Sequence, residues 1–291
     1  QVTLGLEESL GTGDLLPPLW HWLFFNEGAS TRELGEDGHA RLGDFLPPVA
    51  LPRRMWAGGR LTFASPLKIG MEVEKTSQVK SVSRKKGRSG ELCFVTVEHT
   101  FTHENRQLLV EQHDIVYREA VKRQFDRAVS GVVANAVGRG VAGGTAEGTD
   151  GGTIGDLAGD SLSTAGQIRA SAGLIEPLDP HTWCITPSVC ALFRYSALTF
   201  NAHRIHYDRE YCRDVEGYEG LVFHGPLTAT LMAGLARSMT IEPMTRFEFR
   251  AVSPLFDTQQ FQIKAEWQEK AVTINASKLS GEPAMQAKAY F

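Results

Sequence analysis

The sequence predicts an α+β fold in which antiparallel sheets are wrapped around a central helix. Long segments that alternate between polar and apolar residues, separated by tight turns, predict the strands. One apolar stretch, from Gly225 to about Met239, has leucines at helical spacing and small apolar residues on its other sides, which predicts a buried helix. A short strand followed by Ser-Pro-Leu occurs in each half, which indicates two copies of one unit.

The predicted strands form an antiparallel meander in each half. In the first half, the strands are expected over 60–63, from 71 onward, and over 92–101 and 108–117, with a basic hairpin turn at 84–90. In the second half, they are expected over 247–256, 259–268, 271–278 and 284–291. The alternative to a repeat is a chance likeness between short strand-and-turn strings.

Three parts of the chain follow from these patterns: an N-terminal repeat (1–128), a linker (129–173) and a C-terminal repeat (174–291). The linker is rich in Gly, Ala, Thr and Ser and lacks aromatic residues, so we expect it to be flexible and its deletion to leave folding and activity nearly intact. The N-terminal repeat has no histidine motif and is expected to serve as scaffold and pocket wall.

Composition excludes several classes of protein. With 291 residues, 42% hydrophobic and 22% charged, the chain is typical of a globular protein with a sizeable core. A net charge of −4 argues against nucleic-acid binding, and no apolar run reaches the ~20 residues of a membrane span. Four cysteines without metal-ligand spacing favour a reducing compartment, so we expect a cytoplasmic protein, with the mitochondrial matrix as the alternative.

The residues best suited to chemistry lie in the string Phe-Asn-Ala-His-Arg-Ile-His-Tyr-Asp, residues 200–208. The preceding run, 192–200, is apolar enough to be packed inside, so this polar cluster is expected to emerge from a buried segment. Downstream, His224 and Gly225 stand at the start of the predicted helix. A helix N-terminus offers free N–H groups and a positive dipole end, which suit a developing oxyanion.

These residues resemble the MaoC-like double hot-dog dehydratases and hydratases, whose motif reads Asp-x-Asn-Pro-x-His-x-Asp, followed by His-Gly at the start of the central helix. The matching residues are His206, Asp208, His224 and Gly225. The departures are Asn201, His203 and Arg204, which stand where the family has Asp, Asn and Pro.

The departures are similar to those of one branch, which includes mesaconyl-CoA and itaconyl-CoA hydratases and mitochondrial 3-hydroxyacyl-thioester dehydratase. The N-terminal strings Leu-Gly-Glu-Asp-Gly-His (34–39) and Arg-Arg-Met-Trp-Ala-Gly-Gly-Arg (53–60) also resemble that branch. The resemblance implies a tandem hot-dog fold and a hydro-lyase that acts reversibly on an acyl-CoA thioester, either mesaconyl- or itaconyl-like or a 3-hydroxyacyl thioester. It implies no cofactor, with coenzyme A present only as part of the substrate, and it allows a homodimer.

Hydration of a conjugated thioester needs a base for water, a proton for the α-carbon and a stabilised oxyanion. His206 is the predicted base, because its ordinary pKa of about 6.5 keeps much of it neutral near pH 7. Asn201 is expected to hold the water or the His206 ring, and the Gly225 N–H is the predicted oxyanion donor. The source of the second proton stays open between His206 with a water, His203, Tyr207 and Asp208.

Further substrate contacts are expected from six residues: Tyr195, His203, Arg204, Tyr207, Asp208 and His224. Arg204 either binds a substrate carboxylate or phosphate, or forms a structural ion pair with Asp208. His203 either faces the substrate or hydrogen-bonds the loop. No metal is expected, because the two motif histidines lack a third ligand at a defined spacing. Thioester hydrolysis and non-catalytic acyl-thioester binding remain the alternative functions.

Overall fold

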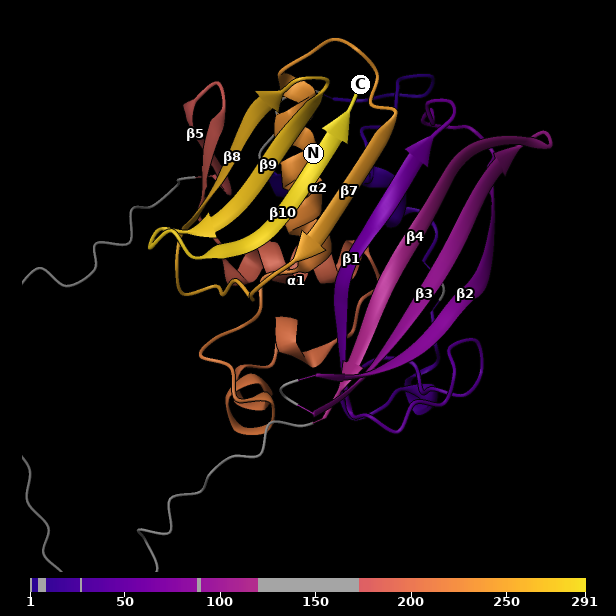
Figure 1. Cartoon of the computed structure of the whole chain (residues 1–291), viewed down its shortest axis with the longest axis vertical. Coiled ribbons are helices and arrows are strands. Elements are labelled where there is room, and N and C mark those ends of the chain that lie inside the picture. The colour runs from indigo at the N-terminus through magenta and orange to yellow at the C-terminus, as the bar shows by residue number, and fades with distance from the viewer. Residues whose placement is uncertain (1, 5–8, 27, 88–89, 120–172) are drawn as a thin grey trace, which may run out of the picture. The chain divides into compact units, whose positions relative to one another are not determined.

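The computed structural model describes residues 2–4, 9–26, 28–87, 90–119 and 173–291. Apart from residue 173, the predicted linker lies outside the described residues. Both repeats belong to one compact unit, and their strands join in a single antiparallel sheet of ten strands, in the order β2-β3-β4-β1-β7-β10-β9-β8-β6-β5 (Figure 1).

The strands are β1 (Arg53–Phe63), β2 (Glu74–Gly87), β3 (Gly90–His103), β4 (Arg106–Arg118), β5 (Ile175–Asp179), β6 (Thr182–Ile185), β7 (Arg246–Ala251), β8 (Phe261–Gln268), β9 (Ala271–Lys278) and β10 (Pro283–Tyr290). The α-helices are α1 (Val189–Leu198) and α2 (Gly225–Ser238). Short helical turns are Val2–Leu4, Trp20–Leu23, Thr31–Glu33, Arg204–His206 and Tyr211–Glu216. Among the described helices, none is long and apolar enough to cross a membrane.

The sheet has the same strand order on both sides of the β1–β7 pair. Outward from β1 come β4, β3 and β2, and outward from β7 come β10, β9 and β8. The corners at the two Ser-Pro-Leu strings are also alike. Ala64 and Ser65 donate their N–H groups to the Leu108 carbonyl, at 2.8 and 3.1 Å, while Val252 and Ser253 donate theirs to the Ala284 carbonyl, at 2.8 and 3.2 Å. The predicted repeat therefore has a structural counterpart in topology and in local hydrogen bonding.

The C-terminal strands wrap around α2, as predicted (Figure 1). Pro226 occupies the first turn, where the missing N–H costs nothing. Nine of the fourteen residues in α2 are buried, including Leu227, Leu231 and Leu235. A helix that is apolar nearly all round needs such an enclosure, and the sheet provides it. The predicted α+β tandem hot-dog fold is confirmed.

The N-terminal strands have no such helix among the described residues; the short turn Trp20–Leu23 lies against them instead. Their lead strand is longer than predicted. β1 begins at Arg53 rather than residue 60, because Arg53–Trp56 pair with Ile115–Arg118 of β4 before a bulge at Trp56/Gly58. Pairing with a partner strand, which the local pattern does not contain, sets this boundary.

The expectation that the run 192–200 is packed inside was wrong for five of its nine residues, which are exposed. This run forms most of α1, which is amphipathic: Leu192 and Tyr195 are buried, but Phe193 and Phe200 are 66% and 65% exposed. A helix that lies on the surface of a domain buries only one face, so the apolar count of the run overstated its burial.

Candidate active site

The motif begins where α1 ends. Ser188 caps the start of α1 by accepting the Ala191 N–H at 3.1 Å, and Phe200 follows the helix in a left-handed conformation with φ of 49°. This conformation is strained for a residue with a side chain. It turns the chain so that the Asn201 N–H donates to the Ser196 carbonyl at 2.8 Å. The Asn201 Oδ1 then accepts the His203 N–H at 3.0 Å, which leaves the side-chain NH₂ as the group available to a ligand.

His206 is held with one defined nitrogen free. Its Nδ1 donates to the Val222 carbonyl at 2.8 Å, which fixes the tautomer and leaves Nε2 with its lone pair. The ring stacks on His224, with centroids 3.7 Å apart and an angle of 18° between the planes. Burial lowers the pKa of His206 to about 4, although the bond to Val222 opposes this. His206 is therefore a neutral base at neutral pH.

His224 connects the motif to the start of α2. It is fully buried, its Nε2 lies 2.9 Å from Ser196 Oγ, and the Tyr195 ring meets it edge-on at 4.9 Å. Burial and the neighbouring His206 and His203 hold its pKa well below the usual value. His224 is therefore neutral, and the ring of His206 packs against it at the start of the helix.

Gly225 leaves space beside the helix N-terminus. A Cβ at this position would lie 3.2 Å from Cε3 of Trp56, closer than side chains normally approach. The first N–H groups of a helix have no intrahelical acceptor, and they carry the positive end of the dipole. The start of α2 therefore lies beside the Trp56 ring, and the role of the Gly225 N–H as an oxyanion donor stays a prediction.

A loop of the N-terminal repeat reaches the motif, which the sequence patterns did not indicate. Gly38 has φ of 89°, and a Cβ there would lie 1.9 Å from the Ala202 carbonyl oxygen, so only glycine fits. The Arg204 N–H donates to the Asp37 carbonyl at 2.9 Å in the same contact. The string Asp-Gly-His at 37–39 is therefore part of the site.

This contact places His39 against His203, with ring centroids 4.0 Å apart. The Asp37 Oδ2 lies 2.8 Å from His39 Nδ1, so the ring is oriented by a carboxylate. His203 in turn meets His206 edge-on at 5.5 Å. Burial, followed by the charges of His39 and His206, lowers the pKa of His203 to about 2. Burial also lowers the pKa of His39, although Asp37 opposes this.

Three predicted substrate contacts are engaged within the loop. Arg204 donates to Asp208 Oδ2 at 2.7 and 3.0 Å and lies 4.1 Å above the Tyr211 ring. The Tyr207 hydroxyl donates to the Ala202 carbonyl at 3.0 Å. The geometry therefore favours the structural alternative for the Arg204–Asp208 pair, and substrate roles for these residues stay predictions.

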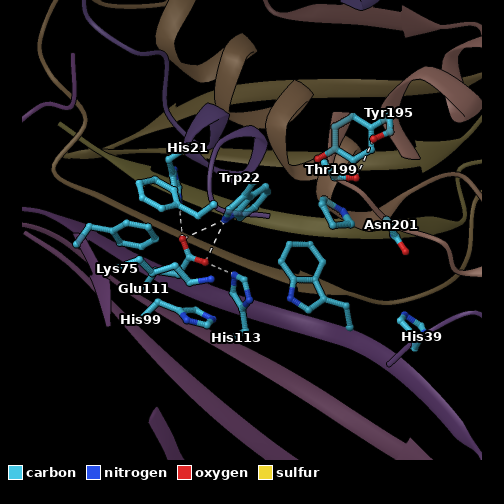
Figure 2. A pocket seen from close by; sticks show the side chains of 14 residues that line it. His21, Trp22, His39, Lys75, His99, Glu111, His113, Tyr195, Thr199 and Asn201 are labelled. Carbon is cyan, nitrogen blue, oxygen red and sulfur yellow. Dashed lines mark hydrogen bonds and ion pairs between the residues drawn. The ribbon is translucent and has the colours of Figure 1, made fainter. Parts of the chain in front are cut away.

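A cavity of about 380 Å³ opens beside the motif and is lined by both repeats (Figure 2). Of the predicted residues, Asn201 and Tyr195 line it directly. His39 also lines it, and it contacts His203. His206, His224 and Gly225 are not among the lining residues: His224 contacts the lining Tyr195 ring, and His206 lies behind it, stacked on His224. The volume is within the range of small-molecule sites.

Among the residues that the structure describes, two groups of side chains could hold a metal ion: Asp37, His39 and His203, and His99, Glu111 and His113. In each group the ligand atoms lie within 4.8 Å of one another, so folding supplies the third ligand that the sequence spacing lacks. In each group, however, the carboxylate is already paired with a histidine of its own repeat. The expectation of a metal-free site stays a prediction.

Comparisons with known proteins agree with this geometry. The family model of hydroxyacyl-thioester dehydratase type 2 matches residues 19–135 and 165–257. The mesaconyl-C(4)-CoA hydratase of Chloroflexus aurantiacus is 37% identical over 94% of this chain and 82% of its own length. The mitochondrial hydroxyacyl-thioester dehydratase type 2 of Schizosaccharomyces pombe is 30% identical over 85% of this chain and 77% of its own.

Solved structures show the same fold at low identity. A MaoC-like dehydratase superposes with a TM-score of 0.55 and 18% identity, over 83% of this chain and 76% of that one. A MaoC-like dehydratase from Phytophthora capsici gives a TM-score of 0.53 and 15% identity, over 86% and 77% of the two chains. Together with the family model and the two relatives, the motif and its setting assign this chain to the hydroxyacyl-thioester dehydratase type 2 family.

Proposed function

We propose that this protein is a hydro-lyase that reversibly adds water across the conjugated double bond of an acyl-CoA thioester. The observation that carries the proposal is the fixed tautomer of His206: its Nδ1 is bound to the Val222 carbonyl, so Nε2 stays basic on a ring that stacks on His224, the N-cap residue of α2. A base next to an oxyanion donor is what this reaction needs. The names of the two relatives support the same reaction class.

In the hydration direction, His206 Nε2 accepts a proton from water as the water oxygen bonds to the β-carbon. The electron pair of the double bond moves to the thioester oxygen, which the Gly225 N–H stabilises. The resulting enolate takes up at the α-carbon the proton that His206 accepted from water, passed on through the imidazoles of His203 and His39, and the dehydration direction reverses each step. Asn201 positions the water through its NH₂ group, because its Oδ1 is already bound to the His203 N–H.

The second proton-exchanging group is the imidazole of His39. Tyr207 donates to a backbone carbonyl, and Asp208 is paired with Arg204, so both are occupied. His39 lines the cavity, is oriented by Asp37 and contacts His203, which adjoins His206. These contacts support a chain of imidazoles that replaces the carboxylate missing at Asn201.

The proposed substrate carries a short dicarboxylic acyl group, as in the name of the Chloroflexus aurantiacus relative. The proposal includes a homodimer, as the resemblance allows, and a cytoplasmic or mitochondrial location. The free state of Cys93, Cys184, Cys190 and Cys212 supports a reducing compartment.

The test is a panel of enoyl- and 3-hydroxyacyl-CoA thioesters, followed by two signals. Hydration is expected to remove the absorbance of the conjugated thioester without releasing free thiol. Release of thiol would establish a thioesterase instead. If the absorbance does not change and no thiol is released, but the thioesters bind saturably, the protein is a non-catalytic binding protein.

A further inference from the structure

Two further cavities border the cavity of about 380 Å³ beside the motif (the site cavity). The larger one, of about 310 Å³ (the entrance cavity), shares four lining residues with the site cavity: Phe25, Lys75, His99 and Thr199. The exposed side chains of Asn26 and Phe45 also border it. The entrance cavity therefore connects the site cavity with solvent.

The smaller one, of about 30 Å³ (the apolar cavity), adjoins Tyr195 of α1. Apolar side chains form most of its wall: Leu4, Leu19, Leu23, Leu198, Leu227 and Trp20. The turn Trp20–Leu23, α1 and α2 border both the apolar cavity and the site cavity. Tyr195 is the one described residue that lines both. A single side chain therefore stands between the two cavities.

Tyr195 is held in place by its surroundings. The residue is 5% exposed, and its ring packs edge-on against His224, with the ring centroids 4.9 Å apart. Figure 2 shows Tyr195 on the same side of the pocket as Asn201 and across from Lys75 and His99. A ligand that enters from the entrance cavity past Lys75 therefore meets Tyr195 at the far end of the site cavity.

The end of the site cavity at the N-terminal sheet does not suit a hydrocarbon tail. Glu111 of β4 is 1% exposed, its Oε2 lies 2.5 Å from His21 Nε2, and Trp22 Nε1 donates to it at 3.0 Å. His113 forms an ion pair with the same carboxylate. A hydrocarbon tail placed here would cover polar and charged groups without replacing their hydration, which costs free energy. This end and the entrance cavity suit the polar pantetheine arm of coenzyme A instead.

We infer that Tyr195 determines the length of the acyl group: its ring forms the partition between the site cavity and the apolar cavity and restricts the protein to short acyl thioesters. The inference rests on the proposed function, because it concerns the acyl group of that substrate. The thioester arm runs toward the entrance cavity, and the acyl group ends against Tyr195. Without the ring, the two cavities would join, and a longer tail would reach the leucines beyond.

The first experiment compares the unaltered protein with Tyr195→Ala on straight-chain 2-enoyl-CoA thioesters of four, six and eight carbons, with mesaconyl-C4-CoA as the reference. In the unaltered protein, kcat/KM is expected to fall ~10-fold or more from four to eight carbons, because the longer tail meets the ring. In Tyr195→Ala, the ratio of kcat/KM for eight carbons to that for four should rise at least ~10-fold, since each buried CH₂ contributes about 0.8 kcal/mol, or ~4-fold.

This ratio does not depend on a general loss of activity caused by the contact of Tyr195 with His224. The same ratio in both proteins would overturn the inference. If the unaltered protein hydrates neither mesaconyl-C4-CoA nor any thioester of the series, the proposed function is refuted instead.

The second experiment locates the tail. Tyr195→Phe is the matched control: it keeps the ring, so the length ratio should stay as in the unaltered protein whatever the effect on rate. Thr230 also lines the apolar cavity, so Thr230→Leu added to Tyr195→Ala should fill the joined space and return the ratio toward that of the unaltered protein. A ratio that stays high in the double variant would place the tail elsewhere, and a raised ratio in Tyr195→Phe would show that the ring is not the barrier. Either result would overturn the inference.

A third measurement uses the unaltered protein alone, so it holds if Tyr195→Ala does not fold. Butyryl-CoA and octanoyl-CoA have no double bond to hydrate and serve as competitive inhibitors. Octanoyl-CoA is expected to inhibit no more strongly than butyryl-CoA, because its extra carbons find no apolar space on the near side of Tyr195. Stronger inhibition by octanoyl-CoA would show that the tail is already buried in an apolar site, which would overturn the inference.

Discussion

The two repeats share a strand order but differ in what fills the concave face. In the C-terminal repeat, β7–β10 enclose α2, whose buried side chains form a continuous core with the strands. In the N-terminal repeat, the same face of β2–β4 is met by the short turn Trp20–Leu23 and leaves a cavity of about 380 Å³.

This difference separates the roles of the two repeats. The helix of the C-terminal repeat begins at Gly225, the proposed oxyanion donor, next to the stacked rings of His206 and His224, and such an arrangement needs a rigid packed setting. The unfilled face of the N-terminal repeat provides space for a ligand and the polar groups that line it. The N-terminal loop at Asp37–His39 then completes the histidine site. One sheet architecture thus yields a core on one side and a binding cavity on the other.

The largest effect is expected for His206→Ala, which tests whether chemistry belongs to the C-terminal repeat. General acid–base contributions are ~10²–10⁴-fold, so kcat should fall by that factor. The circular dichroism spectrum should show that the variant is still folded. His181→Ala is the matched control, since His181 is an exposed histidine of the same repeat. Near-normal turnover by folded His206→Ala would remove the proposed base.

The packing difference is tested by Leu231→Ala in α2, where the side chain is 1% exposed. A cavity in a filled core costs about 2–5 kcal/mol, so the free energy of unfolding in urea should fall by that amount. His99→Leu on the cavity wall should change it by less than about 1 kcal/mol, because no packed volume is lost there. Equal losses from both variants would show that the N-terminal face is packed as tightly as the C-terminal one.

Low pH is expected to destabilise the fold through the buried histidines of the site more than through groups on the exposed surface. Folded pKa values are lowered to about 4 for His206 and His99 and to about 2 for His203, against about 6.5 in an unfolded chain. Below pH ~6.5 the unfolded state binds more protons than the folded state. The free energy of unfolding therefore decreases as the pH is lowered, by about 1.4 kcal/mol per pH unit for each residue. Urea unfolding at pH 7, 6 and 5 measures this. A His203→Gln variant should show a shallower decline, and a flat profile would contradict the lowered pKa values.

The smallest effects are expected at Asn201. Asn201→Ala removes a positioning group and the partner of the His203 N–H, so kcat/KM should fall ~10–10²-fold, consistent with about 1–3 kcal/mol for a bond left unpaired. Asn201→Asp can still accept the His203 N–H and should keep activity, with an altered pH–rate profile because a second titrating group is added. If Asn201→Asp is inactive although folded, this position does not correspond to the carboxylate of the wider family.

Much of the fold could be predicted because its signals are local. The leucine spacing of α2, the alternation of β8–β10 and the two Ser-Pro-Leu strings are each contained in a short stretch of sequence. The motif at 200–208 was equally visible, and it led to His206 and its neighbours. A local pattern determines the element and the residues it carries, since helix and strand periods depend only on neighbouring positions.

The polar cluster of the N-terminal sheet left a weaker signal that could have been found. On β3, the residues at 93, 95, 97 and 101 are buried, and His99 has the same phase. On β4, Leu109 and Tyr117 are buried, and Glu111 and His113 share their phase. Polar residues at core-phase positions conflict with the strand pattern, and such conflicts are expected at functional sites.

Tertiary structure alone decided how the repeats meet. Asp37 and His39 approach His203 because Gly38 allows the loop to touch Ala202, and no spacing in the sequence encodes that distance. The exposure of Phe193 and the third member of each acid–histidine cluster have the same origin. By itself, the sequence determined the elements, the repeat and the principal histidine. The composition of the site depended on contacts between distant segments, since these are selected by the packing of whole surfaces rather than by neighbouring residues.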